Sequence, residues 1–255
     1  MPRSDPATGS MHRSESLAER SQPARASRDP VPNEAVVAAV DDWEGPRRWL
    51  NVAVAIVMLI LTLPVFIVVA ILIKLTSTGP VFYTQTRIGL DRRNKSGSAF
   101  GTRHRVCDLG GQPFVMYKFR TMRFNAERET GVVWAKRNDP RVTFIGRLLR
   151  QGRLDELPQL INVLRGEMNI VGPRPERPSI FARLADQVDE YPQRQRVRPG
   201  ITGLAQIRQQ YDTSVDDVRR KLEFDLKYIE TQGLWTDLMI MLKTIPVVLF
   251  RRGGW

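Results

Sequence analysis

The sequence has 255 residues and a formal net charge of +12, with 39 lysines and arginines against 27 aspartates and glutamates. A single cysteine, Cys107, excludes a disulfide framework, and two histidines without metal-ligand spacing exclude a standard zinc site. The length suits one globular domain with extensions, and the excess positive charge indicates an anionic partner: nucleic acid, a phosphorylated substrate or an anionic membrane surface.

The N-terminal segment, residues 1–46, is rich in Ser, Pro, Arg, Ala, Asp and Glu and has no periodic apolar pattern. Such a composition buries too little apolar surface to offset the entropy lost on folding. We therefore predict a disordered tail of mixed charge, with at most a frayed helix at 34–40. The long polar stretch before the first apolar run also argues against a signal peptide.

The apolar run at residues 50–73 exceeds the roughly 18–20 residues that suggest a membrane segment, which favours membrane insertion over a buried core helix. Pro64 lies near its middle and predicts a kink, because proline removes a backbone hydrogen bond. Arg47 and Arg48 precede the run and Lys74 follows it, so the positive-inside rule gives no orientation. A hairpin that enters and leaves on the cytoplasmic face satisfies both flanks. We expect this re-entry, with a full span as the alternative.

Two short strands are predicted next. A turn at 77–80 precedes an extended segment at 81–86, and the glycines at 110–111 precede a second strand at 112–119. Between the strands lies a basic insertion rich in Gly and Ser, 91–105, which we expect to be a mobile loop. Its charges are either solvated or a contact for lipid headgroups.

The second strand is predicted to bring Lys118 and Arg120 to one face, because side chains at i and i+2 point the same way. Two cations on one face repel each other unless an anion lies between them. Phosphate is the natural anion, since the guanidinium fork matches two of its oxygens. The alternative is an ordinary solvent-exposed strand face.

Two adjacent carboxylates, Asp155 and Glu156, stand at the start of a predicted helix. Pro158 is tolerated only in a first turn, so we expect the helix to begin at about Asp155 and to end near Gly166. The apolar positions recur at helical spacing: Leu154, Leu157, Leu160, Ile161 and Leu164.

The carboxylate pair has two interpretations. In the first, Asp155 caps the helix and Glu156 complements its dipole, which together stabilise by about 1–2 kcal/mol. In the second, they are a nucleophile and a metal ligand that face a polyphosphate. The arginines that could hold this polyphosphate surround the pair in sequence: Arg147, Arg150, Arg153, Arg165, Arg174 and Arg177.

The segments around this helix are short and rich in turns. A turn at 138–141 leads into a predicted helix at 143–150, and a second helix is expected at 179–191. The prolines at 171–175 form a rigid turn that reduces the entropy Arg174 loses when it binds an anion, unless this is an ordinary loop corner. A glycine-rich turn at 198–203 can bring backbone N–H groups close to phosphate or uridine.

Two further helices are predicted near the C-terminus. Residues 215–230 carry acidic and basic side chains around an apolar stripe, with Asp225 and Tyr228 one turn apart. Residues 234–250 are strongly apolar but include Asp237 and Lys243. We expect an interfacial helix there rather than a second membrane span.

These residues together resemble the bacterial sugar transferase family, monotopic phosphoglycosyl transferases that act on polyprenyl phosphate. The resemblance runs from about Arg47 to the C-terminus. It is specific because separate motifs occur in the family's order: an apolar segment with a central proline, TGPVFYTQTRIG, KFRTM, NDPRVTFIG, DELPQ, GPRP, RPGITGLAQ and EFDLKYI. The family match favours the second interpretation of the carboxylate pair.

The resemblance implies an α+β fold, mainly α, with a Pro64-kinked re-entrant N-terminal helix, interfacial amphipathic helices and a small β element. We expect a disordered tail at 1–46, the re-entrant membrane helix at 47–75 and a cytoplasmic catalytic domain at 76–255. The expected location is the bacterial inner membrane, with the catalytic domain on its cytoplasmic face. A homodimer is a candidate assembly.

The resemblance also implies a reaction: transfer of a sugar-1-phosphate from a UDP-sugar to undecaprenyl phosphate with release of UMP, which starts exopolysaccharide or O-antigen assembly. Asp155 attacks the sugar-bearing phosphorus to form an aspartyl-phosphosugar, and we expect nearby arginines to hold its pKa low. Glu156 is the expected Mg²⁺ ligand. The predicted contacts for the diphosphate are Arg150 and Arg174, and Lys118, Arg120 and Arg198 are weaker candidates. Asp225 is expected either to support a residue that contacts the substrate or to be linked to the metal.

Some residues depart from the family pattern. Ile207-Arg208-Gln209 replaces the N-G-R that follows A-Q in some members, which resembles the subgroup that transfers hexose phosphates, and Asn169 stands where serine is frequent. Two rival functions remain. A basic membrane-anchored module could bind lipid or nucleic acid, although carboxylates among the arginines would repel a phosphate backbone, so we expect no nucleic acid. A glycosyltransferase would release UDP instead of UMP.

Overall fold

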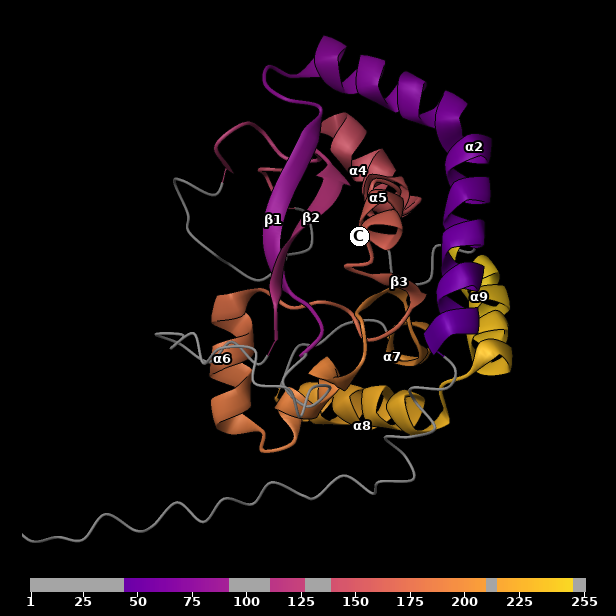
Figure 1. Ribbon diagram of the computed structural model, residues 1–255. Coiled ribbons are helices and arrows are strands. Elements are labelled where there is room, and N and C mark those ends of the chain that lie inside the picture. The colour runs from indigo at the N-terminus through magenta and orange to yellow at the C-terminus, as the bar shows by residue number, and fades with distance from the viewer. Residues whose placement is uncertain (1–43, 92–110, 127–138, 210–214, 250–255) are drawn as a thin grey trace, which may run out of the picture. The chain divides into compact units, whose positions relative to one another are not determined.

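The computed structural model describes residues 44–91, 111–126, 139–209 and 215–249 (Figure 1). Nearly all of the predicted N-terminal tail and basic insertion lie outside these ranges. Within them the chain is mainly helical, with two two-stranded sheets. This agrees with the expected mainly helical fold with a small β element.

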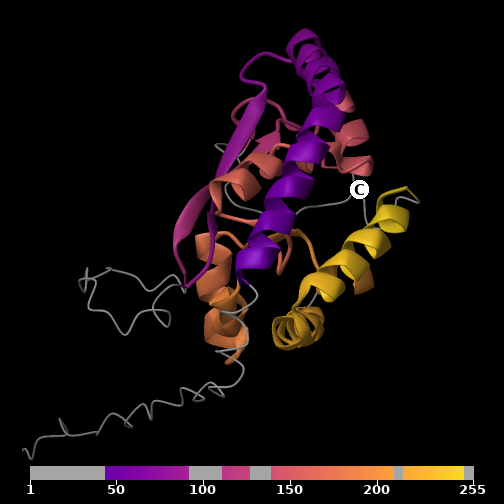
Figure 2. The same cartoon turned by 45° about the vertical axis from the view of Figure 1, so that its right-hand side comes forward.

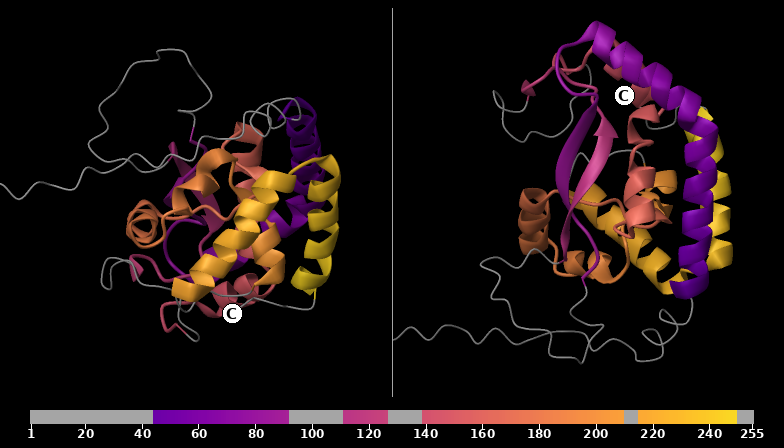
Figure 3. Two further views of the ribbon diagram at one scale, coloured as in Figure 1. Left: turned by 90° about the horizontal axis from the view of Figure 1, so that it is seen from below. Right: turned by 45° about the horizontal axis from the view of Figure 1, so that its top comes forward.

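Helix α2, Glu44–Thr76, contains the apolar run and stays helical through Pro64. It is bent along its length (Figures 1 and 3), as proline inside a helix predicts. Only 11% of its most apolar 18-residue window is buried, at a mean hydropathy of 3.3, which excludes a core helix. The helix is long and apolar enough to cross a membrane, and it indicates membrane association.

Strands β1, Phe82–Ile88, and β2, Pro113–Phe119, pair as an antiparallel ribbon, which confirms both predicted strands. Helix α5, Gln159–Arg165, lies between this ribbon and α2 (Figure 1). Asn162 of α5 fixes the contact, because its side chain accepts from the Tyr117 N–H at 3.1 Å and donates to the Val115 carbonyl at 2.7 Å.

Helix α4, Phe144–Gln151, precedes α5 and is capped by Thr143, as the predicted helix at 143–150 requires. The predicted helix start at Asp155 is wrong by four residues. Leu154–Glu156 form a short 3-10 turn, and α5 begins only at Gln159, after Pro158. The end of α5 is as predicted, with Gly166 at φ 78° in the left-handed region that glycine favours.

The second sheet joins two segments that are distant in sequence. Strands β3, Asn169–Val171, and β4, Gly200–Thr202, run parallel, so the predicted turn at 198–203 contains a strand. A Cβ atom at Gly200 would lie 2.1 Å from the backbone nitrogen of Gly172, which is why only glycine fits. The proline-rich turn begins directly after β3 and is thereby anchored to this sheet.

The remaining helices follow in order. The predicted helix at 179–191 divides into α6, Pro178–Gln187, and the 3-10 helix η3, Tyr191–Arg196, because the chain extends at Val188. The short α7, Leu204–Arg208, leads to α8, Val215–Thr231, and α9, Leu234–Leu249, which confirms both predicted C-terminal helices. Figure 2 shows α8 and α9 at an angle to each other beside α2.

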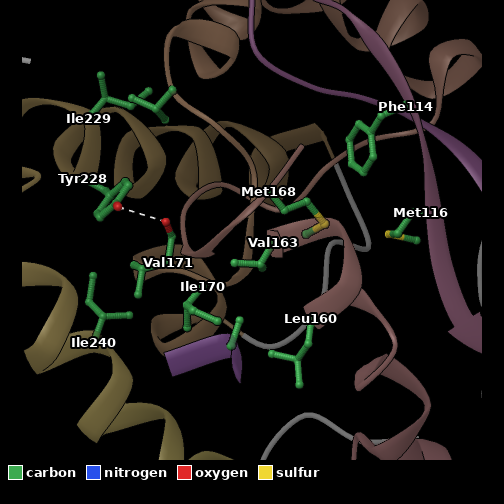
Figure 4. Packing of buried hydrophobic residues seen from close by; sticks show 12 residues of the cluster. Phe114, Met116, Leu160, Val163, Met168, Ile170, Val171, Tyr228, Ile229 and Ile240 are labelled. Atoms are coloured by element: carbon green, nitrogen blue, oxygen red, sulfur yellow. Dashed lines mark hydrogen bonds between the residues drawn. The ribbon is translucent and has the colours of Figure 1, made fainter. Parts of the chain in front are cut away.

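The main hydrophobic core lies between α5, β3 and α8 (Figure 4). Val163, Met168 and Val171 are fully buried there. Tyr228 of α8 closes the cluster, and its hydroxyl donates to the Val171 carbonyl at 3.1 Å (Figure 4). The core therefore ties α8 to the strand that leads into the proline-rich turn.

A second buried contact connects α2 to α8 and α9, and we call it the Arg47 junction (Arg47, Tyr228, Gln232 and Asp237). The Arg47 guanidinium donates to Asp237 at 3.0 Å, to the Tyr228 hydroxyl at 2.7 Å and to Gln232. The Tyr228 hydroxyl also donates to Asp237 at 2.8 Å. The charged end of the apolar helix is thus anchored inside the protein.

Candidate active site

Glu156 is the centre of a buried ion cluster. Its Oε1 accepts from the Lys118 ammonium at 2.9 Å and from the Arg174 guanidinium at 2.6 Å, and Arg153 lies 3.8 Å from Oε2. Burial acts to raise the pKa of Glu156, but the charges of Arg174 and Lys118 outweigh it and hold that pKa well below its usual value. Glu156 is therefore a permanently ionised carboxylate.

Asp155 differs from its neighbour. It is equally buried, yet no hydrogen bond or ion pair reaches its carboxylate from any residue that the structure describes. Burial raises the pKa of Asp155, and the charge of Glu156 adds to this, against the opposing effect of Lys118 and Arg150. The prediction that arginines hold this pKa low is wrong, because the surrounding cations bind Glu156 rather than Asp155.

Lys118 reaches the carboxylate pair from β2, where its ammonium donates to Glu156 at 2.9 Å. Burial lowers its pKa, against the opposing charge of Glu156. Arg120, the residue after β2, makes different contacts. The Arg120 guanidinium instead donates to the carbonyls of Ser77 and Thr78 at the end of α2. The expectation that the two cations share one face is wrong, and Arg120 holds the turn between α2 and β1.

Arg150 approaches from the last turn of α4. Its Nε donates to the Thr121 hydroxyl at 2.9 Å, and Asp155 is the nearby charge with the largest effect on its pKa, which burial lowers. Gly146 allows α4 to pack closely against the chain just after β2, since a Cβ there would lie 2.0 Å from the Thr121 carbonyl oxygen. This close approach places Arg150 beside the carboxylate pair.

Arg198 and Asp225 lie apart from the pair. Arg198 donates to the Gly166 carbonyl at 3.1 Å, at the C-terminal end of α5, where Arg48 also donates to two carbonyls. Cations at this end complement the helix dipole, which explains the position. Asp225 is buried and accepts from Arg194 at 2.7 Å. The structure therefore gives neither residue a direct contact with Asp155 or Glu156.

The prediction missed three charged residues close to the pair: Arg87, Glu176 and Arg194. Arg87 donates to the Pro175 carbonyl, and Arg194 donates to the Arg174 carbonyl and pairs with Glu176. All three residues therefore lie at the proline-rich turn next to Arg174. Arg87 lies inside the TRIG segment and Glu176 directly follows GPRP, so their positions in the motifs could have predicted that they lie near the site. Arg194 had no such signal, because only the fold brings η3 to this turn.

The donor groups of the pair fit a magnesium ion. Mg²⁺ is usually held by one or two carboxylates together with substrate phosphates. Asp155 and Glu156 supply two adjacent carboxylates, of which the first has no cation in contact within the described ranges. No cluster of three or more His, Cys, Asp or Glu side chains occurs in the part of the chain that the structure describes, so an all-protein cage is not found there.

Comparison with known proteins identifies the family. The model of the family described as "Bacterial sugar transferase" matches residues 44–251. The chain belongs to the bacterial sugar transferase family. This confirms the resemblance on which the predicted reaction rests.

Relatives from several bacteria are similar to this member of the family. A "UDP-glucose:undecaprenyl-phosphate glucose-1-phosphate transferase" of Caulobacter vibrioides is 41% identical over 80% of this chain and 69% of the relative. A "UDP-N-acetylgalactosamine-undecaprenyl-phosphate N-acetylgalactosaminephosphotransferase" of Aeromonas hydrophila is 37% identical over 80% of this chain. "Exopolysaccharide production protein ExoY" of Rhizobium meliloti is 36% identical over 82% of this chain and 88% of the relative.

The relatives differ in length. The match spans 43% of the Aeromonas hydrophila protein and 39% of a glucose-1-phosphate transferase of Escherichia coli. It covers more than two thirds of the Caulobacter and Rhizobium proteins. The region shared by all of them contains the carboxylate pair and the residues around it, since the family model runs from the start of α2 through α9.

Proposed function

We propose that this protein transfers a sugar-1-phosphate from a UDP-sugar to undecaprenyl phosphate and releases UMP, in exopolysaccharide synthesis. The names of the relatives support the two substrates, and the exopolysaccharide role is named for the Rhizobium protein. The observation that carries the proposal is the buried carboxylate of Asp155, which has no hydrogen-bond or ion-pair partner among the described residues, beside an ion-paired Glu156.

Asp155 is the proposed nucleophile. A carboxylate oxygen of Asp155 attacks the sugar-bearing phosphorus, a P–O bond forms, and the P–O bond to UMP breaks. A phosphate oxygen of undecaprenyl phosphate then attacks the same phosphorus and releases the Asp155 carboxylate. A side chain without a hydrogen bond or ion pair keeps its oxygen lone pairs available for this attack, which is why the lack of a partner among the described residues matters.

Glu156 holds the cations that the reaction needs. Phosphoryl transfer depends mainly on positioning and charge neutralisation. Lys118 and Arg174, held by Glu156, and Arg150, whose pKa burial lowers and the charge of Asp155 acts to raise, are the proposed contacts for the donor diphosphate. Arg174 suits this role because guanidinium can bind two phosphate oxygens at once. Arg120, Arg198 and Asp225 are not proposed as contacts for the diphosphate, because each is held by other groups: the Thr78 carbonyl, the Gly166 carbonyl and Arg194, respectively.

Mg²⁺ is the proposed cofactor, and Glu156 would hold it. When bound, it neutralises charge on the diphosphate. Glu156 already has Lys118 and Arg174 as counter-ions, so the protein's own cations share this task. Because the ion would still neutralise part of the diphosphate charge, its removal with a chelator is expected to lower transfer, with recovery on addition of Mg²⁺.

The proposed location is the cytoplasmic face of the inner membrane, with α2 re-entrant at its Pro64 bend. The bend and the cations at both ends of α2 support entry and exit on one side. Phe144 of α4 and Trp235 of α9 are 74% and 72% exposed, and large apolar side chains in such positions fit an interfacial location. Cysteine labelling at both ends of α2 from the cytoplasmic side alone tests re-entry.

The proposed sugar is a hexose. The segment Ile207-Arg208-Gln209, at the end of α7, resembles the hexose-phosphate subgroup. The relatives include both glucose-1-phosphate and N-acetylgalactosamine phosphate transferases, so the choice rests on this segment alone. Parallel assays with UDP-glucose, UDP-galactose and UDP-N-acetylgalactosamine test it, and faster turnover of the last would contradict a hexose.

The nucleotide product is the decisive experiment. Purified protein, UDP-sugar, undecaprenyl phosphate and Mg²⁺ are expected to yield UMP. Release of UDP would indicate transfer of the sugar without its phosphate and would contradict the proposal. If the acceptor is withheld, the trapped protein should carry a phosphosugar on Asp155, detected as a mass increase that the Asp155→Asn variant lacks.

A further inference from the structure

The three residues 174–176 are held by backbone contacts from two sides. Arg194 of η3 donates from Nη2 to the Arg174 carbonyl at 3.0 Å. Arg87 of β1 donates from Nη1 to the next carbonyl, that of Pro175, at 2.9 Å. The Ile88 N–H donates to the Glu176 carbonyl at 2.9 Å. The backbone under the Arg174 side chain is therefore fixed at three consecutive positions.

Arg194 is itself held in one orientation. Its side chain is 1% exposed, and each of its nitrogens has a partner: Nε donates to Asp225 at 2.7 Å and Nη1 to the Tyr191 hydroxyl at 2.7 Å. Its guanidinium also lies over the Tyr191 ring, 4.9 Å from the centroid. A side chain this buried does not reach a substrate. Its geometry makes sense as a support for Arg174.

Glu176 is the shared counter-ion behind the turn. Its carboxylate lies 3.3 Å from Lys221, 3.6 Å from Arg194 and 4.0 Å from Arg87. These cations overcome the effect of burial and lower the pKa of Glu176 to about 2. The carboxylate therefore stays ionised and offsets part of the repulsion between Arg174 and Arg87, which adds to the effect of burial in lowering the pKa of Arg87.

We propose that Arg194, held by Asp225 and Glu176, is a positioning residue that orients Arg174 toward the donor diphosphate. The proposal rests on the proposed function in one respect, the contact between Arg174 and the diphosphate. Arg87 supports the same turn from the opposite side through the Pro175 carbonyl. The network gives Asp225 a role through Arg194 and Arg174 rather than a contact with substrate or metal.

A purely structural role predicts a different result, so a double-mutant cycle separates the two. Residues that act through a shared partner have non-additive effects, whereas a general loss of packing adds to any other change. The cycle combines Arg194→Lys with Arg174→Ala. Lysine keeps the charge of Arg194 but lacks the planar fork, so it cannot hold Asp225, Tyr191 and the Arg174 carbonyl together.

The measurement is the affinity of the purified full-length protein for UDP, which does not depend on turnover. We expect Arg194→Lys to weaken UDP binding about tenfold in the wild-type background and less than about twofold in the Arg174→Ala background. The control is Arg219→Lys, a similar change in an exposed ion pair, which should leave the affinity unchanged. Equal weakening in both backgrounds would overturn the proposal.

A second variant covers the case in which Arg194→Lys does not fold. Arg87→Lys changes the opposite support, and it should also weaken UDP binding only while Arg174 is present. If the coupling is found but UMP is not the released nucleotide, the proposed function fails and the positioning role stands. If UMP is released but neither arginine is coupled to Arg174, the positioning role fails and the proposed function stands.

Discussion

Two of the buried clusters of ionisable groups among the described residues, the Arg47 junction and the carboxylate pair, are built differently. In the Arg47 junction every charged group has a partner: Arg47 binds Asp237 at 3.0 Å, and the Tyr228 hydroxyl bonds to both. In the carboxylate pair, Glu156 has two cations within 2.9 Å, while Asp155 has none in contact among the described residues.

The difference indicates which cluster stabilises the fold and which does chemistry. A buried charge is costly unless it is paired, so a fully paired cluster such as the junction fits a structural role. A buried carboxylate without a partner persists only where function maintains it, and perturbed groups of this kind concentrate at functional sites. The junction anchors α2, and the pair is the proposed reaction centre.

The largest expected effect is the loss of transfer in Asp155→Asn. We expect UMP release to fall by about 10³-fold or more, since the nucleophile is lost. Thermal unfolding should be unchanged or shifted to higher temperature, because the change removes a buried charge that no counter-ion of the described ranges contacts. The matched control is Asp216→Asn, the same chemical change at an exposed ion pair. Full activity of Asp155→Asn would remove the basis for the comparison.

The next effect is on stability, through Arg47→Met. Loss of the cation leaves Asp237 buried without its counter-ion, which typically costs about 3–5 kcal/mol. Denaturant unfolding of the purified protein in detergent measures this cost. The double variant Arg47→Met with Asp237→Leu should recover a large part of it. A single variant as stable as the wild type would show that the junction does not anchor α2.

A smaller effect is expected for Tyr228→Phe. The hydroxyl shares its one hydrogen between Asp237 and the Val171 carbonyl and accepts from Arg47, whereas the ring packs in the core. Leaving buried polar partners unsatisfied costs about 1–3 kcal/mol. The free energy of unfolding should fall by this amount. The rate of UMP release should change far less than in Asp155→Asn, because the junction and the reaction centre are separate.

The pH dependence of transfer sharpens the contrast inside the carboxylate pair. The pKa of Asp155 is raised above 3.8, and attack requires the ionised form, so activity should be lost as the pH falls through a value above 3.8. The sign for stability is opposite: the stability linked to protonated Asp155 is present at low pH and lost as the pH rises through the raised pKa. An acid limb of kcat/KM at or below 3.8 would contradict the raised pKa.

Much of the fold follows from local signals in the sequence. The strands around Thr84 and Met116, the helix capped by Thr143 and the stop at Gly166 all follow from alternation, capping and glycine, which act over a few residues. The start of α5 did not follow, because the 3-10 turn at Leu154–Glu156 depends on the left-handed backbone of Arg153. Periodicity does not report such a local reversal.

The site was predictable only in part, for a physical reason. Motifs identified Asp155, Glu156, Lys118 and Arg174, and the structure brings these four together. Which cation pairs with which carboxylate depends on distances between elements far apart in sequence. Sequence patterns therefore could not predict that Arg120 donates to the Ser77 carbonyl, or that Arg194 donates to the Arg174 carbonyl.

The backbone of Arg153 has a consequence for how this protein can change by mutation. Its φ of 53° is a conformation that costs a non-glycine residue about 1 kcal/mol, and glycine would adopt it freely. A glycine at this position would relax the backbone but lose the guanidinium 3.8 Å from Glu156. Glycine at position 153 is thus expected to raise the free energy of unfolding and to lower the rate of transfer. Selection for heat resistance and selection for turnover should therefore favour different residues here.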